Sequence, residues 1–161
     1  MKEIVKKVVL VGHFGVGKTS LVKRFVHQKF SEKYLTTIGV KIDKKIIDLN
    51  GTMVKIMLWD IAGESASTKI PKKYLSGSNG IIYVFDLSRE ETYKNLQSDL
   101  FEMNRSMVES PCIVLANKCD LIDENQLNDI RATVHGDFYV TSAKTGENVE
   151  ECFYHLAKEM M

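Results

Sequence analysis

The strongest chemical signal in the sequence is a glycine-rich loop that ends in a lysine followed by hydroxyl residues. It begins at Gly12, follows an apolar run and reads Gly-x-x-x-x-Gly-Lys-Thr as far as Thr19. Glycines allow the backbone to turn its N–H groups toward an anion, and a helix starting at the loop directs its positive end there. No separate role is assigned to the His13 imidazole. We predict a phosphate-binding loop formed by His13, Phe14, Gly15, Val16, Gly17, Lys18, Thr19 and Ser20.

Side chains elsewhere in the chain could complete a site for a magnesium-bound triphosphate. The Lys18 ammonium would lie between the β- and γ-phosphates, and the Thr19 hydroxyl would be a magnesium ligand. Asp60 follows an apolar run and could hold the ion through water, while the Gly63 amide could meet the γ-phosphate. Thr37 could supply a second hydroxyl to the ion. Asp-x-x-Gly turns are common and a loop threonine is most often only solvated, so these assignments depend on the glycine-rich loop.

Two short polar segments have the chemistry to select a guanine base. The first, Asn-Lys-Cys-Asp at residues 117–120, follows an apolar run. Its Asp120 could accept hydrogen bonds from N1–H and the 2-amino group of guanine, a donor pair that adenine lacks. The stem of Lys118 can lie along the base, and the Asn117 amide can tie neighbouring loops together. The second segment contains Ser142, Ala143 and Lys144. The candidate base-contacting residues of the two segments are therefore Asn117, Lys118, Asp120, Ser142, Ala143 and Lys144.

The elements that must position these residues alternate between β-rich apolar runs and helical patterns. That alternation predicts one α/β domain over residues 1–161, with a mostly parallel sheet of about six strands and about five flanking helices. Asn50-Gly51 separates two β-rich runs and favours a tight hairpin, so one edge strand should be antiparallel. We expect strands at residues 4–11, 40–49, 53–59, 81–85, 112–116 and 138–141, and helices from 18, near 71, over 96–107, 125–132 and 149–160.

Five polar segments, at residues 12–19, 34–39, 59–63, 117–120 and 141–144, together resemble the guanine-nucleotide signature of the Ras superfamily. The stretches 34–40, 55–60, 74–77 and 80–86 are most similar to its Rab branch. The resemblance implies a small G-domain of the P-loop NTPase fold that binds GTP and GDP with Mg²⁺ and hydrolyses GTP. It also implies two switch loops, here about residues 30–41 and 61–73, that contact effectors only when the γ-phosphate orders them. Exchange and activating proteins would act through the same loops.

Two positions depart from that resemblance, and both lie where hydrolysis would occur. Glu64 stands where relatives carry the glutamine that orients the attacking water. A carboxylate there repels the γ-phosphate and cannot donate an amide hydrogen bond, although a protonated or displaced Glu64 could still position water. Phe14 stands where relatives carry a small residue, so it either obstructs a partner's arginine finger or simply packs locally. We expect slow turnover, with Glu64, Lys18, Thr37 and Gly63 as the catalytic candidates.

Composition narrows the class of partner. The 161 residues carry 22 Lys plus Arg against 21 Asp plus Glu, so no strong field favours nucleic acid. Three cysteines without a Cys-x-x-Cys pair and no secretory leader indicate a reducing, cytoplasmic setting. The apolar runs are too short to span a bilayer, so membrane association would need a partner or a tail beyond this sequence.

Two other functions are compatible with parts of this pattern. The first is a binding module that stays loaded with GTP and scarcely hydrolyses it, as Glu64 and Phe14 suggest. The second is an ATP-dependent kinase or ATPase, which is disfavoured because Asp120 selects guanine. We therefore expect a slow, Rab-like GTPase switch.

Overall fold

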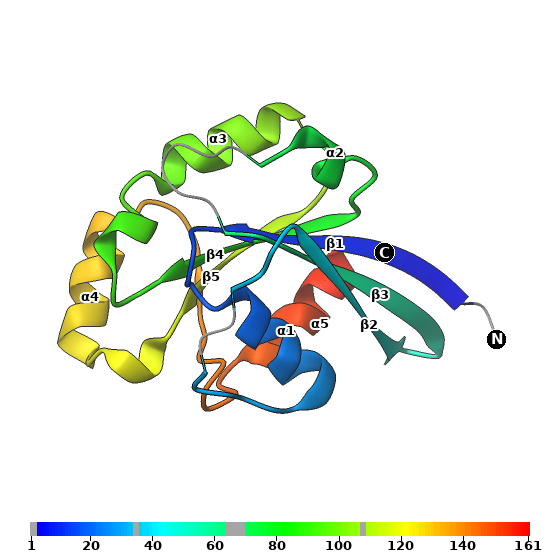
Figure 1. Cartoon of the computed structure of the whole chain (residues 1–161), viewed down its shortest axis with the longest axis horizontal. Coiled ribbons are helices and arrows are strands. Elements are labelled where there is room, and N and C mark those ends of the chain that lie inside the picture. The colour runs from blue at the N-terminus through cyan, green and yellow to red at the C-terminus, as the bar shows by residue number, and fades with distance from the viewer. Residues whose placement is uncertain (1–2, 34–35, 64–69, 107–108) are drawn as a thin grey trace.

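The structure is a computed structural model that describes residues 3–33, 36–63, 70–106 and 109–161. Within these residues the chain forms six strands and five α-helices that mostly alternate along the sequence (Figure 1). The strands are β1 (Glu3–Gly12), β2 (Val40–Leu49), β3 (Thr52–Ile61), β4 (Gly80–Asp86), β5 (Cys112–Asn117) and β6 (Tyr139–Val140). The helices are α1 (Lys18–His27), α2 (Lys72–Leu75), α3 (Leu96–Ser106), α4 (Glu124–Thr133) and α5 (Val149–Glu159).

The strands form one sheet in the order β2-β3-β1-β4-β5-β6. Every neighbouring pair is parallel except β2 and β3, which form an antiparallel hairpin. The turn of that hairpin has positive φ at Asn50 and Gly51, of 53° and 88°. The predicted fold, a mostly parallel sheet with one antiparallel edge strand, is therefore confirmed.

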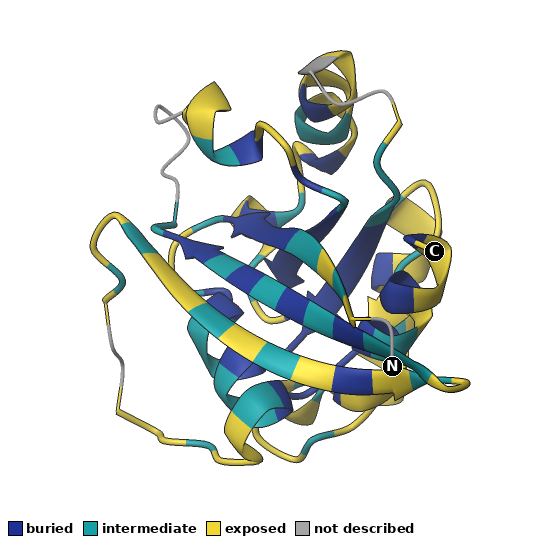
Figure 2. Ribbon diagram, turned by 90° about the vertical axis from the view of Figure 1, so that its right-hand side faces the viewer, coloured by how far each residue is buried: buried dark blue, intermediate teal, exposed yellow. Residues whose placement is uncertain are grey.

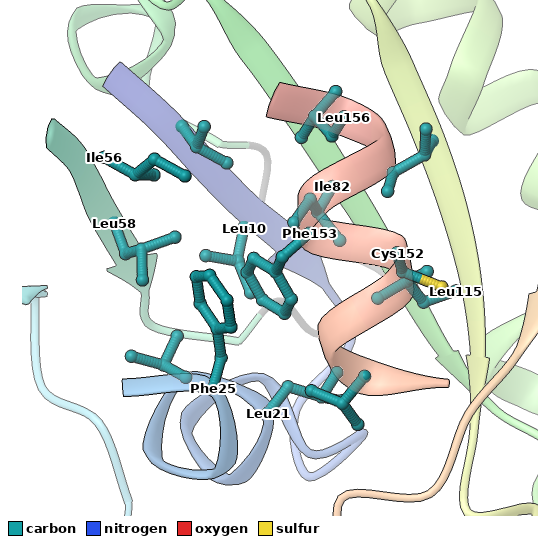
Figure 3. Packing of buried hydrophobic residues seen from close by; sticks show 14 of the residues in the cluster. Leu10, Leu21, Phe25, Ile56, Leu58, Ile82, Leu115, Cys152, Phe153 and Leu156 are labelled. Carbon is teal, nitrogen blue, oxygen red and sulfur yellow. The ribbon is translucent and has the colours of Figure 1, made fainter. Parts of the chain in front are cut away.

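Helices cover both faces of the sheet and create two apolar cores. In Figure 1, α1 and α5 lie on one side of the sheet and α2 and α3 on the other. Between α1, α5 and the sheet, Phe25 and Phe153 stack with ring centroids 4.2 Å apart, as the close view of Figure 3 shows. The other core contains Phe85, which packs edge-on against Phe138 at 5.5 Å.

Burial along the strands follows from their place in the sheet. β4 is central, covered on both faces, and all seven of its residues are buried. β2 is an edge strand and stays largely exposed, whereas buried and half-buried residues alternate along most of β3 (Figure 2). A strand covered on both faces needs a continuous apolar run, which is the pattern on which its prediction rested.

The last strand is shorter than the sequence predicts, whereas α2 begins where it was expected. β6 pairs only Tyr139 and Val140 with β5, so it is shorter than the expected 138–141. At Thr141 the backbone N–H still donates to Ala116 at 2.8 Å, but the chain then turns into a loop whose side chains face polar partners. The short α2 begins directly after Pro71, as expected for a residue without an N–H.

Candidate nucleotide site

The predicted polar segments converge on one cavity beyond the carboxyl ends of the parallel strands, where open α/β sheets bind ligands. The cavity has a volume of about 390 Å³. Its lining includes thirteen of the predicted site residues, namely Phe14, Gly15, Gly17, Lys18, Thr19, Ser20, Thr37, Gly63, Asn117, Lys118, Asp120, Ala143 and Lys144. Lys23, Phe30, Ser31, Glu32, Lys33 and Leu121 also line it. Segments more than a hundred residues apart thus share one site.

The glycine-rich loop joins β1 to α1 with its lysine turned back onto it. Lys18 is only 5% exposed, and its Nζ donates to the carbonyl oxygens of Gly12 and His13 at 3.0 Å each. Gly17 has φ of 102°, and a Cβ there would lie 2.3 Å from Nδ2 of Asn117. A side chain at position 17 is therefore excluded twice, by backbone angle and by space.

Two threonine hydroxyls and a buried carboxylate meet at one end of the cavity. Thr19 Oγ1 donates to Asp60 Oδ2 at 2.5 Å and lies 2.7 Å from Thr37 Oγ1, whose distance to the same carboxylate oxygen is 3.5 Å. Asp60 is 1% exposed, and its Oδ1 finds no hydrogen-bond partner within the described part of the chain. Burial raises the pKa of Asp60, while the hydrogen bonds and the charge of Lys18 oppose that shift.

This donor set fits a hard divalent cation. All three groups offer oxygen, the ligand that Mg²⁺ prefers, and the orphaned Oδ1 is a buried acceptor that lacks a counterpart. An unsatisfied buried carboxylate oxygen is costly, and a bound cation would relieve that cost. Asp60 does not itself line the cavity, but its carboxylate is joined by hydrogen bonds to Thr19 and Thr37, which do.

Asn117 joins three loops from a fully buried position. Its Nδ2 donates to the carbonyl of Val16 at 3.0 Å, which fixes the glycine-rich loop. Its Oδ1 accepts from Thr141 Oγ1 at 3.1 Å and from the Ala143 N–H at 3.2 Å, which fixes the loop after β6. The linking role expected for this amide agrees with that geometry.

Asp120 is held in place by a hydroxyl from the loop after β6. The Ser142 hydroxyl donates to Asp120 Oδ1 at 2.7 Å, so one side of the carboxylate is anchored. Lys144 pairs with Glu32 at 3.1 Å. Arg24 donates from Nε to the Ala143 carbonyl at 2.8 Å, and it also bonds the Lys144 carbonyl. The loop after β6 is thus tied to α1 and to the segment after it.

Phe14 and Gly63 lie back to back at the phosphate end of the cavity. A Cβ on Gly63 would lie 2.4 Å from Cα of Phe14 and 2.7 Å from its N, so only glycine permits this approach. The Phe14 side chain is 47% exposed and lines the cavity. A partner side chain entering here would therefore meet the Phe14 ring.

Several predicted site residues do not line the cavity. His13 belongs to the glycine-rich loop, and burial lowers the pKa of its imidazole. Val16 is fully buried in the core between the sheet and α1, and Ser142 is fully buried beneath Asp120. Any contact of these three with a nucleotide would be through backbone groups. Glu64 lies outside the described residues.

A charged cluster beneath the loop was not predicted from the sequence. Asp86 ends β4 and is 1% exposed, and its Oδ2 lies 3.0 Å from both Arg89 Nε and Lys118 Nζ. Burial acts to raise the pKa of Asp86, but hydrogen bonds from Ser88, Lys118 and Arg89 outweigh it and hold that pKa below its ordinary value. The available signal was an acidic residue directly after a buried parallel strand.

None of the helices in the described ranges is long and apolar enough to cross a bilayer.

Comparison with known proteins gives a consistent result. The Ras family model matches residues 7–161. Ras-related protein Rab-8B from Homo sapiens and from Pongo abelii is 36% identical over 163 residues, covering 96% of this chain and 78% of that protein. Ras-related protein Rab-13 from Bos taurus is 35% identical over 163 residues, covering 96% of this chain and 79% of its own length.

Proposed function

The chain belongs to the Ras family of small GTPases and is Rab-like, and from this premise we propose that its cavity binds GTP and GDP with Mg²⁺ and that it hydrolyses GTP slowly. The observation that carries the proposal is the convergence of Lys18, Thr19 and Asp120 on one cavity of about 390 Å³. A phosphate cradle and a carboxylate suited to guanine that line one cavity match a guanine nucleotide. Residues 1–161 would act as one domain.

Guanine selection would depend on Asp120. Ser142 occupies one face of its Oδ1 at 2.7 Å and so limits the rotation of the carboxylate. The remaining acceptor capacity can receive N1–H and the 2-amino group of guanine together, and charge-assisted bonds of this kind are the strong ones. Ala143 and the Lys118 and Lys144 stems, all of which line the cavity, would complete the base pocket.

The magnesium ion would be held by Thr19 and Thr37, with Asp60 behind them. The orphaned Oδ1 of Asp60 and the cluster of three oxygen groups support this assignment. When bound, the ion supplies neutralisation of the charge on the β- and γ-phosphates. Lys18 would release its bonds to the Gly12 and His13 carbonyls only in part, because its ammonium has three donors.

Slow hydrolysis would follow from the residue types at positions 64 and 14. Glu64 lacks the amide N–H with which a glutamine orients water, and its charge opposes a further anion. Phe14 lines the cavity beside Gly63, where its ring narrows the approach of a partner's arginine. Lys18, Thr37 and the Gly63 amide would remain to position the phosphates, so turnover would be reduced rather than abolished.

Function as a switch depends on partners as well as on nucleotide. Ras family proteins act through effector, exchange and activating proteins, and we propose that residues 30–41 and 61–73 form the corresponding surfaces here. Thr37 and Gly63 lie in these segments and also line the cavity, so either segment can sense the γ-phosphate directly. A bond broken at Thr37 or Gly63 on hydrolysis would release its segment.

Nucleotide identity is the first test. Protein purified with Mg²⁺ and denatured should release GTP or GDP on ion-exchange chromatography, and unlabelled GTP but not ATP should displace a fluorescent guanine nucleotide. Displacement by ATP at similar concentrations would refute guanine selection and favour a kinase or ATPase.

Single-turnover hydrolysis separates the slow switch from a module that stays loaded with GTP. Glu64→Gln and Phe14→Ser should each increase the rate of phosphate release from preloaded protein, with Phe14→Ser acting mainly when an activating protein is present. Leu121→Ser, at the base end of the same cavity, is the matched control for loss of an apolar lining residue. If neither variant at the phosphate end accelerates release, the proposed cause of slow turnover is wrong.

A further inference from the structure

A buried carboxylate beneath the nucleotide cavity gathers two cations from different loops. Both oxygens of Asp86 are engaged: Oδ1 accepts from the Ser88 backbone at 2.8 Å and from its hydroxyl at 2.6 Å. Oδ2 accepts from Arg89 Nε and Lys118 Nζ at 3.0 Å each. A buried carboxylate with this many donors remains ionised and holds its partners in fixed positions.

Each of the two cations also reaches the glycine-rich loop. Arg89 Nη2 donates to the carbonyl oxygen of Phe14 at 2.7 Å, and Lys118 Nζ donates to that of Gly15 at 2.8 Å. Asp86 therefore connects to two consecutive carbonyls of the loop through two different side chains. Arg89 does not line the cavity, so it acts from behind the loop.

The direction of these carbonyls determines the direction of the loop N–H groups. In a planar trans peptide the C=O and the N–H of the next residue point opposite ways. With the Phe14 and Gly15 carbonyls held by the cations, the N–H groups of Gly15 and Val16 face away from them. Those amides belong to the phosphate-binding loop, and pre-positioned donors bind an anion more tightly than mobile ones.

We infer that Asp86 and Arg89 are positioning residues that fix the phosphate-binding amides, with Arg89 acting on the phosphate end alone and Asp86 on both ends. This inference rests on the proposed binding of guanine nucleotides. The asymmetry follows from the contacts. Within the described residues the Arg89 side chain hydrogen-bonds only Phe14 and Asp86, whereas Asp86 also holds Lys118, which would lie beside the base. A single carboxylate thereby couples the base end of the cavity to the phosphate end.

Comparison of GDP with GMP separates positioning from general stability, because GMP lacks the β-phosphate that the loop amides would bind. Arg89→Ala should weaken GDP binding and accelerate GDP release by about tenfold, the effect of one charged hydrogen bond. GMP affinity, measured by displacement titration, should change by no more than about twofold, as for an ordinary surface substitution. A lysine lacks the planar fork with which Arg89 reaches both partners, so the GDP affinity of Arg89→Lys should lie between those of the wild type and Arg89→Ala.

The matched control is Arg105→Ala, which removes an exposed arginine paired at 3.7 Å with Glu102 on α3. It should change neither nucleotide affinity. Asp86→Asn should weaken GDP and GMP together, since it releases Lys118 as well as Arg89. Thermal unfolding of each variant shows whether it is folded. If Arg89→Ala does not fold, the comparison of GDP with GMP affinity is made on Arg89→Lys.

Two results would overturn the inference. One is an unchanged GDP affinity in Arg89→Ala, and the other is an equal loss of GDP and GMP affinity in that variant, which would indicate a merely structural role. Failure of the wild-type protein to bind any guanine nucleotide would instead refute the proposed function. The two failures are therefore distinguishable in the same set of titrations.

Discussion

Replacement of Asn117 by alanine tests how far one buried amide supports the whole site. The side chain makes three hydrogen bonds, to the Val16 carbonyl at 3.0 Å, from Thr141 Oγ1 at 3.1 Å and from the Ala143 N–H at 3.2 Å. All three partners are buried, so removal of the amide leaves each of them unsatisfied. At about 1 kcal/mol for each bond, Asn117→Ala should lower the free energy of unfolding by about 3 kcal/mol.

The assay is urea unfolding at several fixed concentrations of free GDP with excess Mg²⁺. Bound nucleotide adds to stability by mass action, so extrapolation to zero GDP isolates the effect on the protein itself. The dependence on GDP concentration reports the loss of nucleotide affinity separately, and we expect both quantities to fall.

The matched control is Asn125→Ala, which removes an exposed asparagine in α4 and should change stability by less than about 0.5 kcal/mol. Thr141→Val, which removes only one of the three bonds, should cost about a third of the Asn117→Ala effect. A loss below about 1 kcal/mol for Asn117→Ala, with GDP affinity unchanged, would refute the view that this amide ties the loops together.

Three further predictions concern substitutions at Gly17, Asp60 and Asp120, with Gly51 in the β2–β3 hairpin as the comparison for Gly17. Gly51→Ala, at φ 88° in open space, should lower the free energy of unfolding in urea by about 1 kcal/mol. Gly17→Ala should lower it by more and abolish GDP binding, because its Cβ would meet the Asn117 amide. Equal losses in the two variants would contradict this prediction. Burial raises the pKa of Asp60 above its ordinary value of 3.8, so the metal-free folded protein holds this proton more tightly than the unfolded chain. The resulting stabilisation is complete below pH 3.8 and is lost as the pH rises through the raised pKa. Asp60→Asn should therefore stabilise the metal-free protein at neutral pH, and by progressively less toward pH 3.8. The same variant should weaken Mg²⁺-dependent GDP binding. A difference in unfolding free energy between variant and wild type that does not change with pH would contradict the prediction. Asp120→Ala should reduce the preference for GDP over inosine diphosphate, which lacks the 2-amino group, by about tenfold in displacement titrations, and an unchanged preference would remove Asp120 from base selection.

Much of the fold was predictable because its signals are local. The run at residues 81–85 is apolar throughout since its strand is covered on both faces, and Asn50-Gly51 adopts the positive φ angles that a tight hairpin needs. The strand lengths were less predictable at the sheet edge. β6 keeps only Tyr139 and Val140 because the polar partners of Thr141 lie in other loops.

The order of the phosphate, metal and base segments is readable from local pattern, because each segment has its residue types at fixed spacing within a few positions. Which polar groups hold those segments together follows from the folded arrangement of the loops. Asn117 bonds a carbonyl 101 residues away, and Arg89 bonds one 75 residues away. Such pairs depend on which loops meet at the carboxyl edge of the sheet, and no local pattern encodes that meeting. The buried Asp86 beneath the loop is the clearest case, since one carboxylate joins residues from three separate segments.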